Sequence, residues 1–134
     1  MNPEVYIHDI VVRSEHIDNL QHVNNVVYLQ WAQDVAYAHW ISKTPQFIRD
    51  QYKWVVLKHE IEYKSPAFLD DELIAKTWVQ DYTGVKSTRV VQILRKKDER
   101  LLAETRTLWC FISATNNRPT RIVDEVKRLF ASEI

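Results

Sequence analysis

The segment from Val26 to Ile41 constrains the fold more than any other part of the sequence. Its 16 residues contain neither glycine nor proline, so no residue in it interrupts a helix. The apolar side chains surround most of the helical circumference instead of keeping to one stripe. Because a helix that is apolar nearly all round has to be buried on most sides, we expect a continuous helix wrapped by the rest of the chain. Asn24 or Asn25 stands where its N-cap is expected.

The remainder of the chain is mainly strand-like. Four such segments follow the helix with short connections, which favours an antiparallel meander. In the first of them, alternate residues are expected to share one face: Val55, Leu57, His59, Ile61 and Tyr63. A curved antiparallel sheet around one long helix, with a short C-terminal helix, predicts the α+β class and one domain over 1–134. The expected elements are strands at 5–13, 52–64, 72–80, 85–96 and 101–113, and helices at 26–41 and 122–130.

Composition excludes several classes of protein. The 134 residues include 18 basic and 18 acidic side chains, so the net charge of zero offers no field for nucleic acid or an anionic membrane. The one glycine, Gly84, rules out glycine-rich phosphate loops. The one cysteine, Cys110, cannot form an internal disulfide and favours a reducing compartment. With no apolar run of membrane-spanning length and no visible secretory signal, the expected location is cytoplasmic.

The polar loop before the long helix carries the strongest chemical signal. Asp18 is a carboxylate placed seven residues before the helix begins. A helix N-terminus has unpaired backbone N–H groups and a partial positive charge. These groups can stabilise the oxyanion formed at a thioester carbonyl, while a nearby carboxylate activates water or attacks the carbonyl. An Asp in a loop is also an ordinary turn or cap residue, and both interpretations remain open at this point.

This loop resembles that of the hotdog-fold acyl-CoA thioesterases, the group typified by 4-hydroxybenzoyl-CoA thioesterase. The pattern D-x-x-G-H-V-N-N-x-x-Y of that group corresponds to Asp18 through Tyr28 in this sequence. Gln21 replaces the usual glycine, and Asp70 stands where the group commonly has another glycine. The similarity continues in order along the chain, through Val55-Val56, Ile61-x-Tyr63-x-x-Pro66-Ala67, Asp71-Glu72-Leu73, Gly84-Val85-Lys86-Ser87 and Trp109-x-Phe111-Ile112.

The resemblance implies a helix wrapped by a five- or six-stranded sheet, in dimers that join sheet edges and often form homotetramers. It implies an active site at the dimer interface that hydrolyses an acyl-CoA or acyl-carrier-protein thioester, with no metal or prosthetic group. Asp18 would be the nucleophile or general base, and the backbone N–H near Asn25 would polarise the carbonyl. His22 would orient the loop or take part in acid–base chemistry. The implied substrate-binding residues are Val26, Tyr28, Gly84, Lys86, Ser87 and Thr88. Those in the strand after the single glycine would come from the neighbouring subunit.

Two other functions stay open from the sequence alone. One is a non-catalytic acyl-binding or structural module of the same fold, and the other is a dehydratase of that fold. The motifs that dehydratases usually carry are not visible here. The histidines show no spacing with carboxylates or the cysteine that would suggest a metal site. Basic residues are candidates for contact with the CoA phosphates, although most are expected on a solvated face: Lys86, Arg89, Arg95, Arg118 and Arg121.

Overall fold

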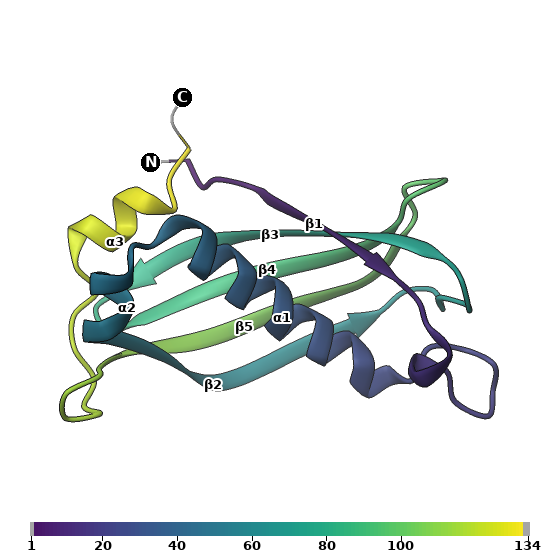
Figure 1. Ribbon diagram of the computed structural model, residues 1–134, viewed down its shortest axis with the longest axis horizontal. Coiled ribbons are helices and arrows are strands. Elements are labelled where there is room, and N and C mark those ends of the chain that lie inside the picture. Colours follow the sequence, from purple (N-terminus) through teal and green to yellow (C-terminus); the bar gives the residue numbers. More distant parts are fainter. Residues whose placement is uncertain (1, 133–134) are drawn as a thin grey trace.

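The computed structural model describes residues 2–132 as a long helix lying across one face of a curved antiparallel sheet (Figure 1). All expected elements are present, and their ends lie within three residues of the predicted ones. A further helix occupies the connection after the long helix. In chain order the elements are β1 (Tyr6–Val11), a 3₁₀ turn (Ser14–His16), α1 (Asn25–Lys43), α2 (Gln46–Gln51), β2 (Tyr52–Tyr63), β3 (Glu72–Thr83), β4 (Lys86–Arg95), β5 (Leu101–Ser113) and α3 (Asp124–Leu129).

The five strands pair in the order β1-β3-β4-β5-β2, and every pair is antiparallel. The predicted meander holds for β3, β4 and β5, which are joined by tight turns. It is wrong for β2, which pairs with β5 instead of β3. The connection at 64–71 therefore crosses from one side of the sheet toward the other, and β2 is left at an edge.

Helix α1 is buried along one stripe only, which corrects the expectation of burial on most sides. Its buried residues recur at a spacing of three or four, as on a helix that packs against a single layer. Val26 and Tyr37 are 71% and 66% exposed, because the sheet covers one side of the helix in a single chain. The buried set is Tyr28, Trp31, Ala32, Val35, Ala36, His39 and Trp40.

The prediction that alternate residues of β2 share one face is also wrong. The register of β2 against β5 shifts between Val56 and Lys58, which marks a β-bulge at Leu57. A bulge adds one residue to a strand and reverses the facing of the residues after it. Val55 and Leu57 are therefore exposed at 41% and 50%, whereas His59 and Ile61 are partly buried.

Two apolar clusters fill the space between the helices and the sheet. The first surrounds the N-terminal half of α1 and includes Trp31, Val35 and Leu73. The second surrounds its C-terminal end and joins Trp40 to Phe111 and to Val126 of α3. The two ends of α1 therefore pack in different apolar clusters.

No helix within residues 2–132 is long and apolar enough to cross a membrane.

Candidate active site

The loop before α1 folds back on itself and brings Asp18 beside His22. Ile17 and Val23 form an isolated antiparallel bridge at its base. Within it, the Asp18 N–H donates to the His22 carbonyl at 3.0 Å, and the Gln21 N–H donates to the Asp18 carbonyl at 3.0 Å. The sequence motif thus becomes a tight hairpin-like loop that ends where α1 begins.

The Asp18 carboxylate has one structural contact and one free oxygen. Its Oδ1 accepts a hydrogen bond from the Leu20 N–H at 2.9 Å, which is an Asx-turn. Its Oδ2 has no hydrogen-bond or ion-pair partner within residues 2–132. The turn role and the chemical role can therefore coexist in this side chain, because they use different oxygens.

The first turn of α1 retains one unused backbone donor. The Asn24 side chain accepts from the Val26 N–H at 3.0 Å, which confirms Asn24 as the N-cap, and the Asn24 carbonyl accepts from the Val27 N–H at 2.9 Å. The Asn25 N–H has no acceptor within residues 2–132. The Asn25 carbonyl is fixed by the Tyr63 hydroxyl, which donates to it at 3.0 Å.

A cavity of about 260 Å³ lies between this loop and the end of β2. His22, Asn25, Tyr28 and Tyr63 line it together with 64–66, whereas Asp18 does not. The Tyr28 hydroxyl is held in the core by the Ala67 N–H at 3.1 Å, and burial raises the pKa of Tyr28. Tyr63 and 64–66 were not predicted as site residues, because only the return of β2 to the helix start brings them here.

The other predicted substrate-binding residues lie at the opposite end of the molecule. The turn at Gly84, where φ is +64°, is joined to the segment just before α3, because the Gly84 carbonyl accepts from the Ile122 N–H at 3.0 Å. Lys86 is exposed and Thr88 partly so, whereas Ser87 is buried and donates to the Asp81 carbonyl at 2.9 Å. Since the 19 residues of α1 span roughly 28 Å, one chain does not unite this group with the Asp18 loop (Figure 1).

A larger cavity, of about 540 Å³, lies beside the C-terminal half of α1 and the start of β2. Five of its 14 lining residues are aromatic, Trp40, Trp54 and Trp109 among them, and Ser87 and Arg89 reach it from β4. Arg89 is only 8% exposed, so among the five basic candidates it is not one that lies on a solvated face. A sequence signal did exist, because Arg89 stands at every second position of β4 with Ser87, Val91 and Ile93, which are all buried.

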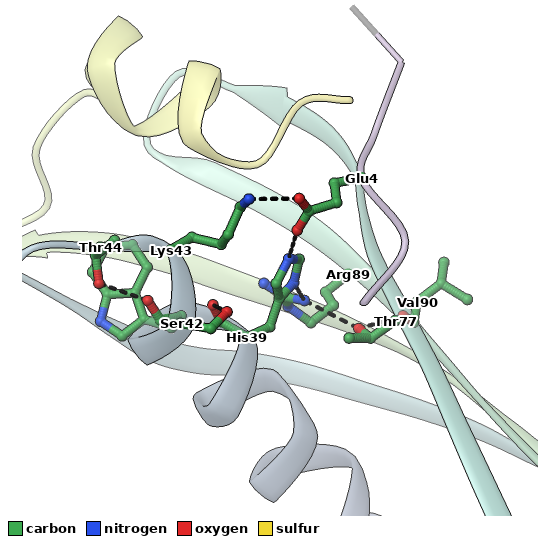
Figure 2. A network of polar contacts seen from close by, with 9 residues as sticks. Glu4, His39, Ser42, Lys43, Thr44, Thr77, Arg89 and Val90 are labelled. Carbon is green, nitrogen blue, oxygen red and sulfur yellow. Dashed lines mark hydrogen bonds and ion pairs between the residues drawn. The ribbon is translucent and has the colours of Figure 1, made fainter. Parts of the chain in front are cut away.

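A polar network connects Arg89 to the N-terminal segment (Figure 2). The Arg89 Nη1 donates to His39 Nδ1 at 2.8 Å and to Thr77 Oγ1 at 3.0 Å. The His39 Nε2–H donates to Glu4 at 3.0 Å, and Lys43 forms an ion pair with Glu4 at 2.6 Å. Burial and the neighbouring Arg89 lower the pKa of His39 to about 4, so its ring is neutral at pH 7.

The two positions at which this sequence lacks the glycine usual in the resembling group both have a left-handed backbone conformation. Gln21 has φ +65° and Asp70 has φ +68°, a left-handed conformation that glycine adopts at little cost. The loop therefore keeps the shape that a glycine would give it, at some expense in stability.

A long helix against a curved antiparallel sheet, with a carboxylate-bearing loop at the helix start, is the hotdog architecture of thioester hydrolases. The chain belongs to the thioesterase-like superfamily, whose sequence model matches residues 12–130. It is 32% identical over 98 residues to the long-chain acyl-CoA thioesterase FadM of Escherichia coli (strain K12), a match covering 67% of this chain and 69% of that protein.

Solved structures share the fold across nearly the whole chain. SAV2348 from Staphylococcus aureus, in complex with CoA, superposes with a TM-score of 0.85 at 17% identity, covering 100% of this chain and 90% of that one. The 1,4-dihydroxy-2-naphthoyl-CoA thioesterase Slr0204 from Synechocystis gives a TM-score of 0.82 at 14% identity, covering 95% and 96%. At these identities the likeness concerns the fold.

Proposed function

We propose that the protein hydrolyses acyl-CoA thioesters with Asp18 as the reacting carboxylate. The observation that supports this most is that Asp18 Oδ2 and the Asn25 N–H, at one loop-to-helix junction, both lack a partner among residues 2–132. The membership of the thioesterase-like superfamily and the likeness to FadM agree with this reaction. An acyl-carrier-protein thioester presents the same carbonyl and is the second substrate to consider.

In the proposed reaction, the thioester carbonyl oxygen accepts a hydrogen bond from the Asn25 N–H. In the general-base route, Asp18 takes a proton from water as the water oxygen bonds to the carbonyl carbon, and the carbon–sulfur bond then breaks. In the nucleophilic route, the Asp18 carboxylate attacks that carbon, the carbon–sulfur bond breaks to leave a mixed anhydride, and water then hydrolyses the anhydride. In both routes CoA leaves as the thiolate, which takes up a proton. The N–H stabilises the oxyanion, and one such donor is typically worth about 3 kcal/mol of barrier. His22, whose carbonyl holds the Asp18 N–H, keeps the loop in place.

We also propose that the working form is a dimer in which two β2 edges pair. β2 ends the sheet, exposes Val55 and Leu57, and an open strand edge of this kind favours pairing. Its first residues, 52–54, line the larger cavity, and Tyr63 at its other end lines the smaller one. Antiparallel pairing of two copies would therefore place the larger cavity of one chain, with the turn at Gly84, beside the Asp18 loop of the other.

The test is hydrolysis of a panel of short, long and aromatic acyl-CoAs, and of an acyl-carrier protein, followed with a thiol-reactive dye. The Asp18→Asn variant keeps the acceptor for the Leu20 N–H but cannot take a proton, so its kcat should fall about a hundredfold or more. His22→Ala should cost less. Asp9→Asn, at an exposed position of β1, is the matched control and should behave like the wild type.

Two results would count against this assignment. Activity of Asp18→Asn within a few-fold of the wild type would reduce Asp18 to a turn residue. Failure of the wild-type protein to release thiol from any substrate of the panel would favour a non-catalytic acyl-binding module instead.

A further inference from the structure

The larger cavity is electropositive as well as aromatic. Three cationic side chains line it, Arg49, Lys53 and Arg89, and none of its lining residues is acidic. Arg49 is occupied by hydrogen bonds to the carbonyl and hydroxyl of Thr44 and to Gln46, and Lys53 lies on the exposed side. Arg89 is thus the cation that this cavity buries.

Arg89 is only partly satisfied by its neighbours. Both of its hydrogen bonds leave from Nη1, toward His39 and Thr77, while Nε and Nη2 have none within residues 2–132. Both atoms keep some solvent-accessible surface, because the polar side-chain atoms that are fully enclosed without a partner belong to other residues. Arg89 also forms no ion pair within those residues. A guanidinium offers a planar fork of donors that matches a carboxylate.

The surrounding network does not neutralise this charge. His39 is neutral at pH 7, so it contributes no charge to the network. Glu4, on the far side of His39, is already paired with Lys43. The set of Glu4, Lys43 and Arg89 therefore carries one excess positive charge. The Phe130 ring, 5.9 Å from the guanidinium carbon, offers only a cation–π contact.

We propose that this cavity receives the acyl part of the substrate and that Arg89 binds a carboxylate at the end of that group remote from the thioester. The inference rests on the proposed hydrolysis of acyl-CoA and on the pairing of two chains. The aromatic walls suit the carbon skeleton, and the buried fork suits its acidic end. The phosphates of CoA fit less well, because a hydrated surface cation such as Lys53 can bind a phosphate without taking it out of water.

The test compares acyl-CoAs in pairs of equal length that differ only in the terminal carboxylate. Adipoyl-, suberoyl- and sebacoyl-CoA are set against hexanoyl-, octanoyl- and decanoyl-CoA, and 4-carboxybenzoyl-CoA against 4-methylbenzoyl-CoA. In the wild type, kcat/KM should favour the carboxylated member of at least one pair by about tenfold or more. Arg89→Met should remove that preference, and Arg89→Lys, which keeps the charge without the fork, should retain part of it. Arg100→Met, at an exposed turn, is the matched control.

Binding separates this inference from the proposed catalysis. Non-hydrolysable CoA thioethers that carry a carboxyalkyl or a plain alkyl chain are compared by calorimetry, with the wild type and both Arg89 variants. Tighter binding of the carboxyalkyl compound that is lost in Arg89→Met supports the cavity assignment even if no substrate is hydrolysed. Preference for the neutral member of every pair, or an equal effect of Arg89→Met on both members, overturns it. If Arg89→Met does not fold, the wild-type preferences and Arg89→Lys decide.

Discussion

His39 should make the stability of the protein depend on pH in the weakly acidic range. The ring is fully buried, stacks on Tyr6, meets the Phe130 ring edge-on, and touches Arg89 and Glu4. Burial and the Arg89 charge lower its pKa from 6.5 in an unfolded chain to about 4. Between these values the unfolded chain binds the extra proton and the folded chain does not, so the free energy of unfolding falls as pH falls through this window.

The size of the effect is set by the two pKa values. A tenfold difference in proton affinity corresponds to roughly 1.4 kcal/mol. The His39 contribution to the loss of stability is therefore about 1 kcal/mol at pH 5.5 and about 2 to 3 kcal/mol at pH 4.5, relative to pH 7.5. Losses of this size are a large fraction of the stability of an ordinary domain.

Urea unfolding between pH 7.5 and pH 4.5, at one fixed protein concentration, measures this loss. His39→Gln is the control, because a Gln amide can accept from Arg89 and donate to Glu4 but does not titrate. The wild type should lose about 2 to 3 kcal/mol more than His39→Gln over this range. Parallel pH profiles for the two proteins, or a His39 pKa near 6.5 in an NMR titration, would refute the reasoning.

Two further predictions concern the backbone and the assembly. Replacing Gln21 or Asp70 by glycine should raise the free energy of unfolding by up to about 1 kcal/mol. The gain should be larger at Gln21, because Asp tolerates a left-handed φ better than Gln does. Unchanged urea midpoints would contradict this. Leu57→Lys, at the exposed bulge of β2, should shift sedimentation toward the 16.0 kDa monomer, and an unaltered oligomer would argue against pairing through β2.

The elements were predictable wherever the sequence shows a simple period. β5 has the predicted bounds, and α1 is the continuous helix expected from its lack of breakers. The bulge at Leu57 was not predictable, because no glycine or proline marks the extra residue in β2. The exposed side of α1 was missed for another reason. An apolar composition shows that a helix face has to be buried, but it does not show whether the residues that bury it belong to the same chain or to another one.

The candidate site was predictable only as far as its members are close in the sequence. Asp18, His22 and Asn25 share one motif, and the loop that joins them keeps them together. Arg89 sits at an inward position of β4, but a charged residue in a strand is usually assigned to the solvated face. The contacts of this buried cation depend on non-local packing against His39, which no spacing along the chain reveals.

The separation of the two cavities along α1 has a consequence for inheritance. In the proposed pair, each site takes its carboxylate loop from one chain and its acyl cavity from the other. A chain damaged in the loop still carries a sound cavity, and a chain damaged in the cavity still carries a sound loop. When two such alleles are expressed together, a mixed pair assembles one intact site and one doubly damaged site, although each allele alone forms only defective pairs. Recessive lesions at the two ends of this helix would thus complement each other.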